Sequence, residues 1–429
     1  MRKLLAAMLM TFFLTPLPVI STEKKLIFSK NAVYQLKQDV VQSTQFYNQI
    51  PSNPNLYQET CAYKDSDLTL PAGRLGVNQP LLIKSLVLNK ESLPVFELAD
   101  GTYVEANRQL IYDDIVLNQV DIDSYFWTQK KLRLYSAPYV LGTQTIPSSF
   151  SFAQKVHATQ MAQTNHGTYY LIDDKGWASQ EDLVQFDNRM LKVQEMLLQK
   201  YNNPNYSIFV KQLNTQTSAG INADKKMYAA SISKLAPLYI VQKQLQKKKL
   251  AENKTLTYTK DVNHFYGDYD PLGSGKISKI PDNKDYRVED LLKAVAQQSD
   301  NVATNILGYY LCHQYDKAFR SEIKALSGID WDMEQRLLTS RSAANMMEAI
   351  YHQKGQIISY LSNTEFDQQR ITKNITVPVA HKIGDAYDYK HDVAIVYGNT
   401  PFILSIFTNK STYEDITAIA DDVYGILKL

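Results

Sequence analysis

A serine and a lysine stand three residues apart, Ser231 and Lys234, at the start of the apolar run 228–238. If this run is a helix, the two positions lie on one face. The Lys234 amine can then accept the proton of the Ser231 hydroxyl, as a base does beside a nucleophile. The spacing therefore predicts that Ser231 is acylated during turnover.

The Ser-x-x-Lys spacing occurs three times in the chain, at 21–24, 231–234 and 321–324. The first follows the N-terminal apolar stretch, at the expected signal cleavage region, and the third lies in a polar helical stretch. Only the second opens an apolar helix and is followed by Ser-Asp-Asn at 299–301 and Lys-Ile-Gly at 382–384. Chance occurrence in a chain rich in serine and lysine is the alternative, and the matched order argues against it.

The three motifs in this order resemble those of the penicillin-recognising serine enzymes, and of class A β-lactamase-like proteins in particular. The resemblance covers about residues 186–429, and the run 299–305 is especially similar. It implies an α/β fold in which helices flank an antiparallel sheet.

The resemblance also implies a role for each matched residue. Ser231 attacks a carbonyl, and Lys234 is its base, with a pKa lowered by burial and neighbours. Ser299 passes a proton to the leaving nitrogen, and Asn301 holds a substrate amide. Lys382 supplies positive charge for a substrate carboxylate and tunes Ser299.

The same resemblance places an oxyanion hole at the end of the third motif. The N–H groups of Ser231 and Asp385, the latter directly after Gly384, would donate to the developing oxyanion. Asp300 is expected to support its loop and not the chemistry.

Two departures from the family pattern concern the substrate and the second half of the reaction. Ile383 stands where the family has Thr or Ser, so a hydroxyl that would bind a β-lactam carboxylate is missing. The segment between Asn301 and Lys382 is short and holds no run similar to the family's Ω-loop, whose Glu activates the deacylating water. Glu334 is the candidate replacement. Without such a base, the acyl-enzyme should react slowly with water.

Hydrophobic periodicity places these motifs on elements. Helical spacing over 186–198 precedes a strand at 206–210, and the nucleophile opens the next helix. Further helices are expected in the three stretches 288–298, 302–307 and 340–351, strands in 377–382, 392–397 and 401–407, and a closing helix in 413–429.

The first half of the chain shows short β-like segments separated by turn residues. Residues 22–77 are polar and are expected to form a linker with a helical stretch. Residues 78–120 and 121–185 are expected to form two small barrels, which resemble bacterial SH3-like and GW-type modules. Leu134-Tyr135-Ser136-Ala137-Pro138 and Gly176-Trp177 carry that resemblance. Such modules bind wall polymers or serve as spacers.

Composition excludes several function classes. The 429 residues are enough for two or three domains, and the net charge of +2 leaves no nucleic-acid footprint. The seven histidines show no metal-binding spacing, so neither a metal nor a cofactor is expected. Cys61 and Cys312 exclude a disulfide framework but leave one bridge open.

The N-terminus predicts an exported protein. Arg2 and Lys3 precede a mostly apolar stretch to Ile20, which is typical of a signal peptide over residues 1–21. An uncleaved membrane anchor is the alternative. The protein is therefore expected outside a bacterial cell, secreted or associated with wall or membrane.

We predict a serine hydrolase that forms an acyl-enzyme with a β-lactam or a peptidoglycan-peptide amide. One alternative is a D,D-carboxypeptidase or penicillin-binding enzyme with slow deacylation. The other is a non-catalytic wall-binding protein with a degenerate hydrolase domain.

Overall fold

The computed structural model describes residues 45–251 and 253–428. The predicted signal peptide or anchor, residues 1–21, and the polar stretch 22–44 lie outside the described residues. The chain divides into two compact units. The first consists of the described residues through Gln119 together with the segments 137–144 and 162–168. The second consists of the remaining described residues.

Short antiparallel strands build the first module. They are β1 (Pro54–Leu56), β2 (Thr60–Tyr63), β3 (Pro71–Leu75), β4 (Ile83–Leu88), β5 (Pro94–Leu98), β6 (Tyr103–Glu105) and β7 (Ile111–Asp113). Five of them form a sheet in the order β3-β2-β6-β5-β4, and β1 pairs with β7. Phe96, Val104 and Ile111 lie in its small core.

The prediction that residues 22–77 form a linker is wrong from residue 54 onward. β2 and β3 belong to the same sheet as β4 to β6. β3 has the sequence PAGRL and is almost entirely exposed, so it lacks the alternation of apolar and polar residues that marks a half-buried strand. Its pairing with β2 identifies it as a strand, and that pairing leaves no trace in the hydrophobic pattern.

A second sheet follows. Its strands are β8 (Asn118–Thr128), β9 (Leu134–Tyr135), β10 (Thr145–Ile146), β11 (Lys155–Thr164), β12 (Gly167–Ile172), β13 (Gly176–Ser179) and β14 (Leu183–Val184), with the short 3-10 helix η1 (Gln180–Asp182). The strand order is β10-β9-β13-β12-β11-β8-β14. β8 runs across the boundary predicted between residues 120 and 121. The sheet-rich first half of the chain agrees with small β domains.

The C-terminal domain is an α/β structure, as predicted. Its five-stranded antiparallel sheet has the order β16-β15-β23-β22-β21. The strands are β15 (Tyr206–Gln212), β16 (Ser218–Ile221), β21 (Val379–Ala386), β22 (Tyr389–Val396) and β23 (Phe402–Asn409). Residues on both faces of β22 and β23 are buried, which explains their unbroken apolar sequences.

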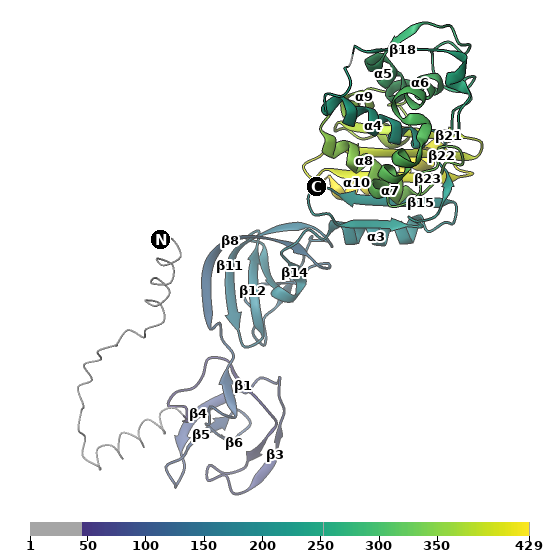
Figure 1. Ribbon diagram of the computed structural model, residues 1–429. Helices are drawn as coiled ribbons and strands as arrows, with labels where there is room; N and C mark the ends of the chain where they lie inside the picture. The colour runs from purple at the N-terminus through teal and green to yellow at the C-terminus, as the bar shows by residue number, and fades with distance from the viewer. Residues whose placement is uncertain (1–44, 252, 429) are drawn as a thin grey trace, which may run out of the picture. The chain divides into compact units, whose positions relative to one another are not determined.

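Helices cover both faces of this sheet (Figure 1). One face packs against α3 (Arg189–Lys200) and α10 (Tyr413–Leu427). The other packs against the larger group α4 (Leu235–Gln246), α5 (Val288–Gln298), α6 (Asn301–Leu311), α7 (Lys317–Ser327), α8 (Ser340–Gln353) and α9 (Gln356–Leu361). Short pieces complete the domain: β17 (Met227–Tyr228), η2 (Ala230–Lys234), β18 (Thr255–Thr257), η3 (Lys260–Asn263), β19 (Asp285–Arg287), η4 (His313–Tyr315), β20 (Leu337–Leu338) and η5 (Arg370–Thr372).

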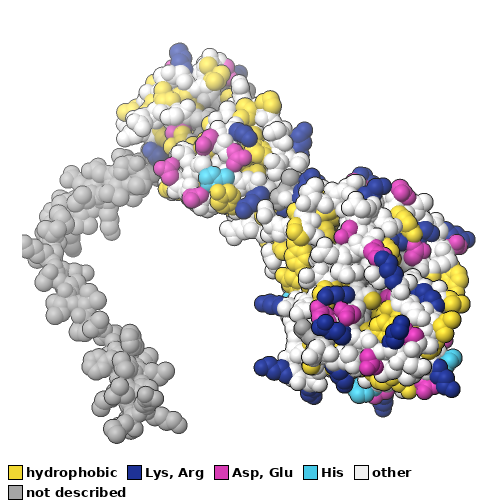
Figure 2. Space-filling model, turned by 90° about the horizontal axis from the view of Figure 1, so that it is seen from above, with side chains coloured by type: hydrophobic (Ala, Val, Ile, Leu, Met, Phe, Trp, Pro, Cys, Tyr) yellow, Lys and Arg dark blue, Asp and Glu magenta, His cyan; other side chains and the backbone are white. Residues whose placement is uncertain are grey.

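Three further findings bear on the predictions from composition. On the face seen in Figure 2, Lys and Arg side chains are interspersed with Asp and Glu, in keeping with the small net charge. Cys61 and Cys312 are free thiols, so the bridge left open by the sequence is not formed. Within residues 45–251 and 253–428, no helix has the length and apolar character needed to cross a membrane.

Candidate active site

Ser231 lies where the chain turns from β17 into the α4 helix. It belongs to η2, a 3-10 helix that continues directly into α4, so the predicted helix start is confirmed. Ala230 before it has a φ of 49°, in the left-handed region that a residue with a Cβ seldom occupies. The Ser231 side chain is nearly buried, with 9% of the residue exposed. The hydroxyl therefore lies in a confined site at a helix N-terminus.

The Lys234 ammonium contacts the second motif and not the Ser231 hydroxyl. Its Nζ donates to the Ser299 carbonyl at 2.6 Å and to Asn301 Oδ1 at 2.6 Å. No hydrogen bond joins Lys234 Nζ to Ser231 Oγ in the described chain, although the i, i+3 spacing predicted one. A charged amine has only donors, so it takes the two carbonyl oxygens within reach.

Burial sets the protonation of Lys234. It is the main cause that holds the pKa of this fully buried amine well below its usual range, and the nearby charge of Lys382 acts in the same direction. Asp300 acts against both. A lowered pKa makes the neutral amine more accessible, as a general base requires.

The Ser299 hydroxyl lies between the two amines of the site. Lys382 Nζ donates to Ser299 Oγ at 2.8 Å, and Lys234 Nζ lies 3.4 Å from the same oxygen. Ser299 ends α5 in the left-handed conformation, with φ 55° and ψ 36°. Burial lowers the pKa of Lys382 to about 7, Asp392 opposes this shift, and Arg370 adds to it. The first, second and third motifs therefore meet at one point.

The acid of the second motif is structural, as expected. Asp300 caps α6 by accepting the Ala303 N–H at 2.8 Å. Its second oxygen accepts the N–H groups of Lys276 and Ile277 at 2.6 and 2.9 Å. Asp300 thereby fastens the loop before β19 to the start of α6.

The same loop contacts Asn301. The Asn301 side-chain N–H₂ donates to the Asp270 carbonyl at 2.8 Å, which leaves one of its two hydrogens for a ligand. Its backbone N–H donates to Ser274 O at 2.9 Å. At Gly273 a Cβ would come within 2.3 Å of Asn301 Nδ2, so the loop passes the second motif at a distance only glycine permits.

β21 is an edge strand, and its glycine lies against the nucleophile segment. A Cβ on Gly384 would come within 2.6 Å of the Ala229 carbonyl and 2.9 Å of Ile232 Cγ1. Asp385 follows directly, so its N–H lies on the strand that contacts η2. This close approach is what an oxyanion hole shared by Ser231 and Asp385 requires.

The wall beside Lys234 is aromatic. Lys234 Nζ lies 4.4 Å from the centroid of the buried Tyr269 ring, and the Arg336 guanidinium lies 3.7 Å from it. The Tyr269 hydroxyl bonds Ser233 Oγ. Asn305 holds the backbone of the same residue, accepting its N–H at 2.7 Å and donating to its carbonyl at 2.8 Å. Tyr269 is thus fixed at both ends.

Glu334 does not reach the amine. It is exposed, and its carboxylate accepts the Gly267 N–H at 3.0 Å. Among the described residues, no carboxylate forms an ion pair or a hydrogen bond with Lys234. The structure therefore gives Glu334 a loop-binding contact and leaves the family's water-activating carboxylate without a counterpart at Lys234.

A second ionic cluster lies at the end of β21. Arg370, which is 1% exposed, pairs with Asp385 at 2.5 Å and stacks on Tyr413 with 3.9 Å to the ring centroid. The Tyr413 hydroxyl also bonds the Asp385 carboxylate. The Nε of Arg370 is buried without a partner. Ile383, two residues before Asp385, is buried and brings no hydroxyl to this end.

Two histidines flank the third motif without entering it. Burial lowers the pKa of His381, but Asp392 and Asp367 prevail and raise it to about 9. Burial lowers the pKa of His391 to about 4, and its Nε2 lies 2.9 Å from the Tyr228 carbonyl. Both histidines support β21, the strand that carries Lys382 and Gly384, and its neighbour β22.

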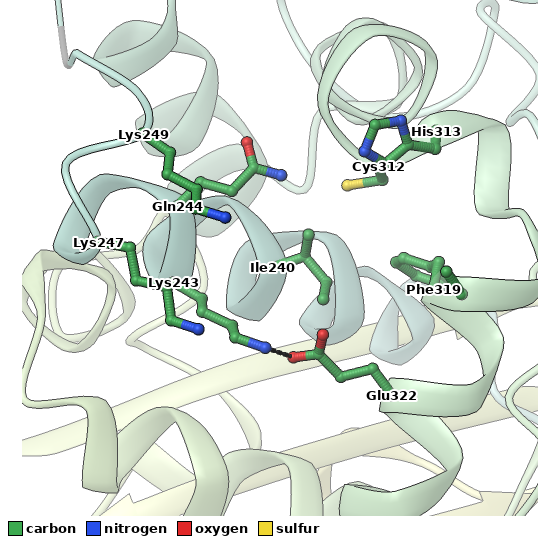
Figure 3. A pocket seen from close by; sticks show the side chains of 10 residues that line it. Ile240, Lys243, Gln244, Lys247, Lys249, Cys312, His313, Phe319 and Glu322 are labelled. Carbon is green, nitrogen blue, oxygen red and sulfur yellow. Dashed lines mark hydrogen bonds and ion pairs between the residues drawn. The ribbon is translucent and has the colours of Figure 1, made fainter.

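A pocket elsewhere on the helical side is lined by none of the site residues (Figure 3). Ile240 and Phe319 form its apolar part, and the Lys243–Glu322 ion pair crosses it. Lys247 and Lys249 lie at its rim. The described residues hold no group of His, Cys, Asp and Glu side chains suited to a metal ion.

Sequence reasoning found the residues of the three motifs but missed Tyr269, Arg336 and Arg370. These three residues belong to no motif, and their partners are distant in sequence. Tyr269 stands in the stretch Tyr-Gly-Asp-Tyr-Asp at 266–270, which contains none of the three motifs. For Arg370 and Arg336 the sequence offered no signal.

Two parts of the chain match families of known proteins. Residues 188–427 match the family described as "Beta-lactamase enzyme family", and residues 46–111 match a domain of unknown function, DUF5776. A search of curated protein sequences found no match.

Several solved structures are similar. One is PBP-A, at 16% identity, TM-score 0.45, covering 56% of this chain and 94% of that one. Another is a β-lactamase from Sphaerobacter thermophilus DSM 20745, at 16% identity, TM-score 0.45, covering 56% and 97%. A third is a β-lactamase from Xanthomonas campestris pv. campestris str. ATCC 33913, at 13% identity, TM-score 0.44, covering 56% and 98%.

Proposed function

The chain belongs to the β-lactamase enzyme family, and from this premise we propose that it is a serine hydrolase that forms an acyl-enzyme on Ser231 and releases it slowly. The substrate is an amide of the β-lactam or peptidoglycan-peptide type. The observation that carries the proposal is the meeting of the three motifs at one hydroxyl, with Ser299 Oγ 2.8 Å from Lys382 Nζ and 3.4 Å from Lys234 Nζ.

Acylation begins when Lys234 is neutral. Its lone pair then accepts the Ser231 proton, and Ser231 Oγ forms a bond to the substrate carbonyl carbon. The carbonyl oxygen takes the electron pair and is held by the N–H groups of Ser231 and Asp385. Asn301 orients the substrate through its remaining N–H.

Collapse of this intermediate breaks the carbon–nitrogen bond. The proton held by Lys234 passes through the Ser299 hydroxyl to the leaving nitrogen, and Lys382 stabilises the charge on Ser299 during the transfer. The 2.8 Å contact between Lys382 and Ser299 supports this path. The ester on Ser231 remains.

Deacylation needs a base for water. Among the described residues, the Tyr269 ring and no carboxylate lies against Lys234, and Glu334 is exposed and binds Gly267. The absence of a carboxylate base at this place supports a slow second step. This favours a penicillin-binding enzyme over an efficient β-lactamase. Ile383 in place of a hydroxyl residue points the same way.

The test is to incubate the full chain with a fluorescent penicillin and to follow its intact mass over time. We expect one adduct that persists, and no adduct in Ser231→Ala. Rapid loss of the adduct with turnover would instead indicate a β-lactamase. No adduct, together with no Ser231-dependent activity on wall peptides, would leave the degenerate wall-binding scaffold.

We further propose that the protein is exported and contacts the bacterial cell wall through its β modules. The signal-like N-terminal sequence and the resemblance of the sequence of residues 78–185 to SH3-like and GW-type modules support this proposal. Residues 45–185 should sediment with purified peptidoglycan, as should the full chain, and residues 186–429 alone should not. Equal sedimentation of all three would contradict it.

A further inference from the structure

Asp385 directly follows Gly384, the residue of β21 that contacts the nucleophile segment. A carbonyl held by the N–H groups of Ser231 and Asp385 runs alongside the last residues of β21. Gly384 fixes this approach, because β21 contacts η2 there at a distance that leaves no room for a Cβ. Whatever charge the substrate carries next to the scissile bond therefore meets the Asp385 side chain, which is 33% exposed.

The cation that could attract a substrate carboxylate at this place is already paired. Arg370 is 1% exposed and donates to Asp385 at 2.5 Å, while its planar guanidinium group lies over the Tyr413 ring. The Tyr413 hydroxyl adds a second donor to the same carboxylate. Arg370 thus binds a carboxylate that the chain itself provides.

The other positive groups do not replace it. Lys382 Nζ is committed to Ser299 Oγ and to the Ile383 carbonyl at 3.0 Å. Lys390 lies opposite Asp385 in the β21–β22 register, and its ammonium lies 5.9 Å from the Tyr413 ring centroid. No ion pair between Lys390 and Asp385 occurs in the described part of the chain. A substrate carboxylate would face Asp385 first and be repelled.

We propose that Asp385 selects substrates that carry no free carboxylate next to the scissile bond. The substrate class is a peptide that continues beyond this bond, or one whose terminal carboxylate is amidated. This inference rests on the proposed acylation of Ser231 and adds the specificity of the same site. Asp385 acts through charge on the substrate, and its backbone N–H keeps its own role.

Two probes that differ only in this charge test the proposal. Benzylpenicillin and its methyl ester are incubated with the full chain, and acylation rate constants are taken from intact mass, each divided by the probe's rate of hydrolysis in buffer. We expect the ester to react at least tenfold faster by this measure. In Asp385→Asn the ratio of the corrected rate constant of the ester to that of benzylpenicillin should fall at least tenfold, because Arg370 is then free to bind the substrate carboxylate.

Asp388→Asn is the matched control, since it removes the same charge from an exposed residue of the same hairpin. It should leave the ratio within about twofold of the wild type. Lys390→Met tests the remaining cation, and a larger effect there than in Asp385→Asn would overturn the assignment. A wild-type preference for benzylpenicillin would overturn it without any variant.

The outcomes separate the two proposals. If neither probe acylates Ser231, the proposed function fails. If both acylate it at equal corrected rates, the proposed function stands and the selectivity of Asp385 is refuted. Melting temperatures of the variants show whether a changed ratio reflects a damaged fold.

Discussion

Replacing Gly384 by alanine should leave the domain folded but greatly lower the rate of acylation. The new Cβ would stand 2.6 Å from the Ala229 carbonyl, and ordinary contacts begin at about 3.4 Å, so β21 and η2 must separate by about 0.8 Å. Both partners are backbone or buried side chain and cannot turn away. Inserting a methyl group into a packed site costs about 1–3 kcal/mol of unfolding free energy, which a domain with this core tolerates.

The cost to the reaction should be larger. A displacement of about 1 Å at a reacting centre lowers rates about 100-fold, and loss of one oxyanion donor lowers them about 100- to 1,000-fold. We therefore expect the acylation rate constant of Gly384→Ala to fall at least about 100-fold. Intact mass spectrometry with a fluorescent penicillin measures the rate, and urea unfolding measures the stability.

Gly425→Ala is the control. Gly425 lies in α10 with no atom within 4 Å of a built Cβ, so alanine there should stabilise the helix by about 0.5–1 kcal/mol and leave acylation unchanged. A folded Gly384→Ala that is acylated at the wild-type rate would refute the close approach of β21 to η2 as the basis of the oxyanion hole.

Four further predictions concern the residues of the site. Because burial lowers the pKa of Lys382 to about 7, the acylation rate should fall as pH rises through about 7. Lys382→Arg should abolish this decrease in rate, because arginine stays charged. A decrease that persists in this variant at the same pH would assign the titration to another group. Between about pH 7 and the usual lysine pKa, this lowered pKa means that the folded state binds fewer protons than the unfolded chain. The free energy of unfolding should therefore rise with pH in this range. Lys382→Met should reduce that rise in urea unfolding measured at several pH values. Asp300→Ala removes the α6 cap and the acceptor of two loop N–H groups and should cost about 3 kcal/mol in urea unfolding, whereas a loss below about 1 kcal/mol would show that the loop is held elsewhere. Glu334→Gln should leave the lifetime of the acyl-enzyme unchanged within about twofold, since Glu334 binds Gly267 and not Lys234, and a much longer lifetime would identify it as the water-activating base.

The sequence was sufficient for the α/β fold and for the convergence of the three motifs. Burial determines which residues occupy long apolar strands such as β22 and β23 and amphipathic helices such as α5. These elements can therefore be predicted from the hydrophobic pattern of the sequence. The first two motifs stand at the ends of such helices, and the third lies within the buried strand β21. β3 could not be found, because an exposed strand is held by backbone pairing that imposes no pattern on its side chains.

The contacts of the site were harder to predict for a different reason. The i, i+3 spacing placed the Lys234 amine beside Ser231, but a charged amine turns to the best acceptors, and these lie in Ser299 and Asn301. Tyr269 comes from a loop and Arg370 from the three-residue 3-10 helix η5, and neither is long enough for a periodic pattern to fix the direction of a side chain. Their roles depend on tertiary contacts that a single sequence does not encode locally.

The hydroxyls of Ser231 and Ser299, to which the proposed reaction assigns roles, lie on or next to disfavoured backbone. Ala230, immediately before Ser231, and Ser299 have φ values of 49° and 55°, and each such conformation costs about 1 kcal/mol or more that surrounding packing must offset. When heating loosens that packing, the backbone at Ala230 and Ser299 should relax to favoured φ and ψ values before the helices and the sheet unfold. Thermal inactivation is therefore expected at a lower temperature than global unfolding, with the loss reversed on cooling as long as the core remains intact.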